Sequence, residues 1–309
     1  MSRRAITEEV SWLLSRSNKD ILELLLKDQT LSSEKNQYIY WATDDYAFDY
    51  SGKILPKYFV GKLIDTIQPR ISKHQSLQHS RAKKRAEVFT PSWICNIQNN
   101  LIDDEWLGYN GAFNNETTLS DGSHSWMTTT QKVHFPQGKS WASYILSKRM
   151  EMSCGEAPYI VSRYDTTTGK AIPLHERIGI LDRKIRIINE NTPQEPTKNH
   201  KRQWLRRVYQ ALQAIYGFDW QGDNVFLARE SVFLSFCEYY KDRWDKLPNM
   251  KSMIKAAEII SWNIWQMDGT TYNIPETDIP CYIMDWKSTT PLIGERIRFK
   301  RLINKNDNG

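Results

Sequence analysis

Short apolar segments alternate with longer amphipathic ones in the second half of the chain, and this alternation constrains the fold more than any other feature. Helical patterns and short apolar segments follow one another at 202–215, 215–220, 224–240, 250–260 and 281–284. The segments at 215–220 and 281–284 predict strands, and the others predict helices. Strands separated by helices favour an α/β layered sheet. We therefore expect an α/β domain over residues 86–309.

The first 85 residues carry helical patterns of their own. Apolar side chains recur at helical spacing over 7–28, and a second helical pattern covers 58–80. We therefore expect a mainly helical extension over residues 1–85. Such an extension could pack on the α/β domain, bind DNA or mediate dimerisation, and the sequence does not choose among these roles.

The composition is that of a folded protein without a membrane anchor. The chain has 309 residues with 12 Trp, 15 Tyr and 10 Phe, which supply enough apolar surface for a substantial core. The sequence has no apolar N-terminal segment and no long apolar run, so we expect neither a signal peptide nor a membrane span. The four cysteines show no Cys-x-x-Cys spacing, which argues against structural zinc. We therefore expect a cytoplasmic protein with reduced thiols and no bound metal.

A turn of small residues follows an acidic residue in the segment Glu151–Tyr159, which reads Glu-Met-Ser-Cys-Gly-Glu-Ala-Pro-Tyr. Glycine in such a turn lets backbone N–H groups approach a ligand closely, which a bulky residue would prevent. In an open α/β sheet, ligands bind at the carboxyl ends of the strands. If Glu151 ends a strand, Gly155 therefore becomes a candidate for close approach to a ligand.

Three other segments join this turn in a recognisable order. Phe89-Thr90-Pro91 lies before it, Ile215-Tyr216-Gly217-Phe218-Asp219 lies after it, and Asn263–Gly269 contains Asp268. In this order the segments resemble the motif series of bacterial DNA adenine-N6 methyltransferases of restriction–modification systems. The resemblance covers roughly residues 86–290, and the whole chain is similar to small M subunits of restriction enzymes. It implies a class I S-adenosylmethionine (SAM) methyltransferase fold.

The resemblance also implies the residues that hold SAM. Phe89, Thr90 and Pro91 would close over the cofactor, with the ring of Phe89 against the adenosine. Glu151 would face the amino group or the sulfonium, and Gly155 would approach the methionine part. Asp219 would accept hydrogen bonds from both ribose hydroxyls, and Asp268 would accept one from the adenine amino group. Each residue also has an ordinary structural interpretation as a core ring, a turn glycine or a helix-capping acid.

The catalytic motif of the family, Asn/Asp-Pro-Pro-Tyr/Phe, does not occur in this sequence. Its polar residue accepts hydrogen bonds from the amino group of the flipped base, and its aromatic ring stacks on that base. The positional equivalent after a short strand is Asp285-Trp286-Lys287. The resemblance therefore implies Asp285 as the acceptor and Trp286 as the stacking ring, while Lys287 is foreign to the pattern.

A basic run stands just before the Phe-Thr-Pro segment. Arg81, Lys83, Lys84 and Arg85 place four cations within five residues. Such a cluster can neutralise DNA phosphates, and its alternative interpretation is a solvated basic loop. We expect DNA as a partner, together with another restriction–modification subunit as a second candidate.

Two further functions use the same residues. Asp268 followed by Asp285-x-Lys287 has the spacing of PD-(D/E)xK nucleases, in which two carboxylates hold Mg²⁺. A catalytically degenerate subunit that binds DNA or a protein partner is the non-enzymatic alternative. The favoured hypothesis is adenine-N6 methyl transfer from SAM.

Overall fold

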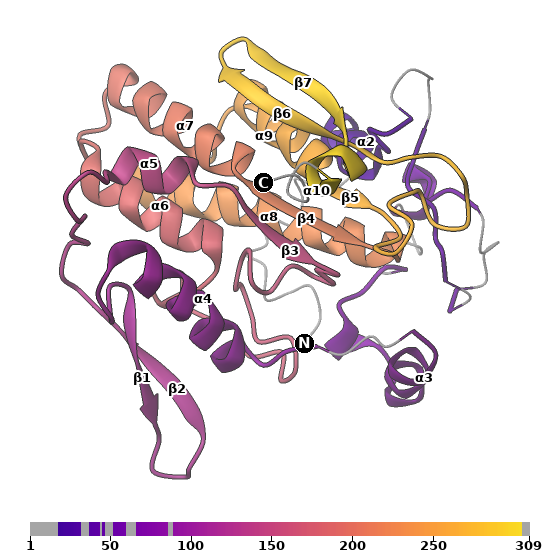
Figure 1. The fold of residues 1–309 in the computed structure, drawn as a ribbon, viewed down its shortest axis with the longest axis horizontal. Helices are drawn as coiled ribbons and strands as arrows, with labels where there is room; N and C mark the ends of the chain where they lie inside the picture. Colours follow the sequence, from indigo (N-terminus) through magenta and orange to yellow (C-terminus); the bar gives the residue numbers. More distant parts are fainter. Residues whose placement is uncertain are drawn as a thin grey trace.

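The computed structural model describes residues 18–31, 37–43, 45–46, 52–59, 66–85 and 89–304. Its centre is a parallel sheet of three strands, β3 (Arg149–Met152), β4 (Ile215–Asp219) and β5 (Ile264–Gln266), in the order β3-β4-β5. Glu151 lies opposite Gly217, and Asp219 lies opposite Gln266. Because the strands are parallel, their carboxyl ends share one edge of the sheet (Figure 1).

Long helices connect the strands and cover the sheet. α6 (Ile180–Asn191) and α7 (Lys198–Gln213) lie between β3 and β4, and α8 (Gly222–Trp244) and α9 (Met250–Asn263) lie between β4 and β5. All five residues of β4 are buried, as expected for a parallel strand covered on both faces. The α/β class expected from the sequence is confirmed. The strand expected at 215–220 is β4, and the helices expected at 202–215, 224–240 and 250–260 correspond to α7, α8 and α9.

The helical connection from the N-terminal region to β3 carries a projecting hairpin. α4 (Ser92–Leu107) precedes β1 (Asn114–Thr118) and β2 (His124–Thr128), which pair antiparallel and extend away from the sheet (Figure 1). α5 (Trp141–Leu146) then leads into β3, and a short turn η7 (Leu174–Glu176) precedes α6.

A second antiparallel hairpin closes the described chain. β6 (Tyr282–Thr289) pairs with β7 (Leu292–Arg298), and α10 (Lys300–Asn304) follows. The strand expected at 281–284 is the beginning of β6. The hairpin packs on the sheet through a small apolar cluster that includes Phe218, Trp265 and Phe299.

The described part of the N-terminal extension shares its core with the sheet. It contains α2 (Lys19–Leu26), η4 (Pro56–Phe59), η6 (Arg70–Ser72) and α3 (Gln75–Arg85). α2 lies within the helix expected at 7–28, whose residues 7–17 are outside the described ranges. Ile21 and Leu25 of α2 are fully buried in the same cluster as the side chains of α8 and α9. None of the helices in the described ranges is long and apolar enough to cross a membrane.

Arg229 of α8 joins the extension to the sheet. Its guanidinium is fully buried and donates to the carbonyl oxygens of Leu25 (2.8 Å) and Lys27 (2.9 Å) at the end of α2. It also donates to those of Ser261 (2.9 Å) and Ile264 (2.7 Å), where α9 passes into β5. The last carbonyls of a helix have no partner within the helix, so one side chain satisfies two helix ends.

Replacing Arg229 with Met should lower the free energy of unfolding by at least about 3 kcal/mol, because buried carbonyls that lose their donors carry a desolvation cost. Arg206→Met, on the exposed face of α7, is the matched control and should change that free energy by no more than about 0.5 kcal/mol. Urea denaturation of both variants measures the difference. Equal stabilities would contradict the role assigned to Arg229.

Candidate functional site

The turn after β3 lies against the end of β4. Ser153, Gly155 and Ala157 have φ angles of 51°, 52° and 61°, so the chain folds back through the left-handed region three times in five residues. The backbone N–H of Gly155 donates to Oδ2 of Asp219 at 2.9 Å. Glycine adopts such angles without strain, whereas Ala157 does not. The turn therefore brings a backbone donor onto the acid that ends β4.

The Phe-Thr-Pro segment packs on this turn. The buried ring of Phe89 would lie 3.6 Å from a β-carbon placed on Gly155. Thr90 accepts a hydrogen bond through its carbonyl oxygen from Oγ1 of Thr166 at 3.1 Å, and Pro91 is the N-cap of α4. The structure therefore brings Phe89, Gly155 and Asp219 together from three distant parts of the sequence.

Asp165 fixes the start of α4, a contact that sequence reasoning missed. Its Oδ2 accepts from the backbone N–H of Ser92 at 2.7 Å, in the first turn of the helix. Burial alone would raise the pKa of Asp165, but hydrogen bonds from Thr167, Ser92 and Thr168 lower it to about 2. The turn signal Asp-Thr-Thr-Thr-Gly at 165–169 marks this residue in the sequence.

Two buried carboxylates at this edge have no cation beside them within the described part of the chain. Burial raises the pKa of Glu151 well above its usual value, and the charge of Asp219 raises it further against hydrogen bonds from Tyr159 and Ile160. Burial also raises the pKa of Asp219 to about 6, although the N–H groups of Gln221 and Gly155 oppose the shift. Desolvation dominates both shifts because no opposite charge among the described residues offsets it.

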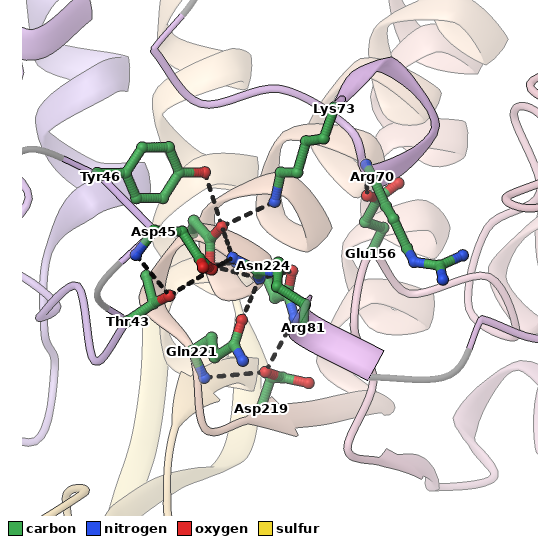
Figure 2. Close-up of polar contacts among 11 residues, drawn as sticks. Thr43, Asp45, Tyr46, Arg70, Lys73, Arg81, Glu156, Asp219, Gln221 and Asn224 are labelled. Carbon is green, nitrogen blue, oxygen red and sulfur yellow. Dashed lines mark hydrogen bonds and ion pairs between the residues drawn. The ribbon is translucent and has the colours of Figure 1, made fainter. Parts of the chain in front are cut away.

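The neighbouring carboxylate of Asp223 does have cations beside it, and its partners Tyr46, Lys73 and Arg81 are labelled in Figure 2. Asp223, in the first turn of α8, accepts from Nζ of Lys73 at 3.0 Å and from Nη1 of Arg81 at 3.0 Å. The hydroxyl of Tyr46 donates to it at 2.8 Å, and Arg81 also pairs with Asp45 at 2.7 Å. Burial opposes ionisation, but Lys73 and Arg81 hold the pKa of Asp223 well below its usual range. This ion cluster fastens η6 and α3 to the turn after β4.

Arg81, the first cation of the basic run before Phe89, differs from the exposed DNA contact expected from the sequence. Arg81 is 1% exposed, because the carboxylates of Asp45 and Asp223 hold its guanidinium inside the protein. Lys83 is exposed. The side chains of Lys84 and Arg85 lie outside the described residues. Of the four cations, Arg81 is a structural ion-pair residue here.

Glu156 links the turn to the extension. Its Oε1 accepts from the backbone N–H of Arg70 at 2.6 Å, and its Oε2 accepts from the hydroxyl of Tyr164. Its carboxylate is buried and engaged on both oxygens. Sequence reasoning identified neither Arg70 nor Tyr164 as part of this region.

Asp268 lies at the same edge of the sheet, just after β5. Its Oδ1 accepts from the backbone N–H of Thr270 at 2.8 Å and from the hydroxyl of that residue at 2.7 Å. Its Oδ2 accepts from the hydroxyl of Thr271 at 2.9 Å. Asp268 therefore stabilises its own turn at the edge where β3 and β4 end, the edge that carries Glu151 and Asp219.

Asp285 and Trp286 lie toward the other end of the sheet. Asp285 pairs with Lys148 at 2.6 Å and with Lys287, and Lys148 directly precedes the first residue of β3. Nε1 of Trp286 donates at 2.7 Å to Oδ1 of Asn263, which directly precedes β5. The structure does not bring these two residues to the carboxyl edge that carries the proposed cofactor set.

The same separation applies to the nuclease pattern. Asp268 follows the carboxyl end of β5, whereas Asp285 and Lys287 pair with each other beside the amino end of β3. Within the ranges that the structure describes, no group of three or more His, Cys, Asp or Glu side chains could hold a metal ion.

No protein-family model matches the sequence, and comparisons with curated proteins and with solved structures gave no significant match.

The raised pKa of Asp219 predicts a pH dependence of stability. Between its ordinary pKa of 3.8 and the folded-state value of about 6, the native protein keeps a proton that the unfolded chain releases. The free energy of unfolding should therefore fall by about 3 kcal/mol as pH rises from about 4 to about 6. Asp219→Asn cannot titrate and should lack this component in urea denaturation across the same pH range. Parallel pH profiles for the two proteins would refute the assignment.

Proposed function

We propose that the chain is a SAM-binding, methyltransferase-like subunit of a DNA restriction–modification system, acting in adenine-N6 methylation. The observation that carries the proposal is the convergence of Phe89, Gly155 and Asp219 at the carboxyl edge of a parallel sheet. These residues come from three segments of the motif series, and ligands of open α/β sheets bind at this edge. If the short motifs matched by chance, their residues would have no reason to lie together in the fold.

Charge complementarity supports a cationic cofactor at this edge. SAM carries a positive sulfonium and a positive ammonium group, and Glu151 and Asp219 are buried carboxylates without a cation in the described part of the chain. A cation placed between them would favour their ionised forms and recover the electrostatic cost of their burial. Both acids therefore favour SAM over a neutral or anionic ligand.

The resemblance assigns a part of SAM to each residue. Asp219 would hold the ribose through one hydroxyl, for which its Oδ2 keeps a lone pair beside the bond from Gly155, while its Oδ1 already accepts from Gln221 and Asn224. Phe89 would pack on the adenosine, and Thr90 and Pro91 would hold the start of α4 over it. Asp268 would reach the adenine after a change of its present bonds to Thr270 and Thr271.

Methyl transfer needs the amine nitrogen of the acceptor base aligned with the sulfonium methyl group. Asp285 and Trp286 were the sequence candidates for holding that base, and they lie away from the proposed cofactor edge. We therefore propose that SAM binding is the primary activity of this chain. Methylation of DNA is to be assayed with and without a partner restriction–modification subunit.

Titration calorimetry with SAM tests the proposal. The wild-type protein should bind SAM with micromolar affinity, and Asp219→Ala should weaken binding at least about tenfold, because charged hydrogen-bond acceptors contribute about 1.5–3 kcal/mol. Affinity should rise from pH 5 to pH 7.5, because Asp219, with a pKa of about 6, ionises over that interval, and an ionised carboxylate is the stronger acceptor for a ribose hydroxyl.

Asp278→Ala is the control, because this acid is exposed and lies on a surface turn. Absence of SAM binding at millimolar concentration would refute the proposal and favour the degenerate subunit. Equal affinity of the wild type and Asp219→Ala would refute the ribose assignment alone.

A further inference from the structure

Arg70 lies against the proposed SAM site, beside the ring of Phe89. Its Cζ is 5.1 Å from the centroid of the Phe89 ring. Its Nε is buried without a hydrogen-bond partner. Within the described part of the chain its guanidinium makes no ion pair, and in Figure 2 it points away from both Glu156 and the Asp223 cluster.

The backbone of Arg70 is held on both sides. Its N–H donates to the buried carboxylate of Glu156, the residue that follows Gly155. Its carbonyl oxygen accepts from the N–H of Lys73 at 2.9 Å, and the side chain of Lys73 is fixed by Asp223. The guanidinium therefore extends from a fixed backbone position beside the turn, and no carboxylate among the described residues forms an ion pair with it there.

The other cations near this edge are already engaged. Lys73 and Arg81 both pair with Asp223, and Arg81 pairs with Asp45 as well. Arg163 pairs with Glu238 at 2.5 Å. Among the described residues around Phe89 and Gly155, Arg70 is thus the cation that can accept a new anion without breaking an existing ion pair.

We propose that Arg70 binds the carboxylate of the amino-acid end of SAM. This inference rests on the proposed function and adds a residue that the motif series does not contain. SAM carries two positive groups and one carboxylate. The edge offers the matching charges, namely the acids Glu151 and Asp219 and the guanidinium of Arg70. A planar guanidinium suits a carboxylate because two parallel N–H groups can bind its two oxygens.

The partial burial of Arg70 favours this ligand over a DNA phosphate. Cζ of its guanidinium lies 5.1 Å from the centroid of the Phe89 ring, which is expected to cover the adenosine. A cation intended for the DNA backbone would extend into solvent, as Lys83 of α3 does. Arg70 is instead attached to the cofactor turn through Glu156.

The test uses two ligands and three proteins. SAM and its decarboxylated analogue, which has the same adenosine, sulfonium and amine but no carboxylate, are titrated by calorimetry into the wild type, Arg70→Gln and Lys83→Gln. The last variant removes an exposed positive charge of the same extension. Glutamine keeps the backbone N–H that binds Glu156, so Arg70→Gln should retain the wild-type melting temperature.

The wild type and Lys83→Gln should bind SAM about tenfold or more tightly than the analogue, the difference expected for one charge-assisted contact. Arg70→Gln should bind both ligands equally, with the affinity that the wild type has for the analogue. Equal losses for both ligands would make Arg70 a structural residue and overturn the inference.

Unchanged SAM affinity in Arg70→Gln with weakened binding to a DNA duplex would overturn it in favour of a phosphate contact. If the wild type binds neither ligand, the proposed function itself fails. If the wild type binds SAM and Arg70→Gln binds it equally well, only the inference about Arg70 fails.

Discussion

The carboxylate of Asp223, buried between Lys73 and Arg81, is the interaction on which the geometry of the site depends. It attaches a segment from the first quarter of the chain to the first turn of α8, directly beside the acid that ends β4. Removing one member of such a cluster leaves a buried charge without a partner, which costs several kcal/mol. The positions of Arg70, Glu156 and Phe89 follow from this attachment, because η6 lies between the cluster and the turn at Gly155.

Charge is distributed unevenly over a short distance at this edge. Asp223 has two cations, and its pKa is lowered, whereas Asp219 four residues earlier and Glu151 on the adjacent strand have none among the described residues, and their pKa values are raised. Burying a carboxyl group without a cation is unfavourable, so a fold that needed these acids only for structure would be more stable with apolar or amide side chains. This pair of acids supports the proposal that a cationic cofactor binds at this edge.

The sequence predicts best what depends on local pattern. The strand expected at 215–220 is β4 at Ile215–Asp219, and the helix expected at 250–260 is contained in α9 at Met250–Asn263. Both come from uninterrupted apolar periodicity. Arg81 was expected on the surface because a run of cations does not reveal a partner 142 residues away. Asp285 and Trp286 were placed by their order after a strand, which does not specify the end of the sheet to which a hairpin returns. Arg70 was missed because a single arginine outside a basic run gives no sequence signal.

The role of Trp286 in the fold sets this residue apart from the proposed cofactor residues. Its indole N–H donates to Asn263, whose amide nitrogen in turn donates to the carbonyl oxygens of Leu212 and Ile215, each at 2.9 Å. The ring thereby fixes the junction of α7, α9 and the sheet. Stacking it on a flipped base would leave these buried groups with one donor fewer, at the cost of an unsatisfied acceptor. A residue that supports the junction is a poor candidate for a mobile base contact. For this reason we place the proposed cofactor site at the carboxyl edge of the sheet and not at the β6–β7 hairpin.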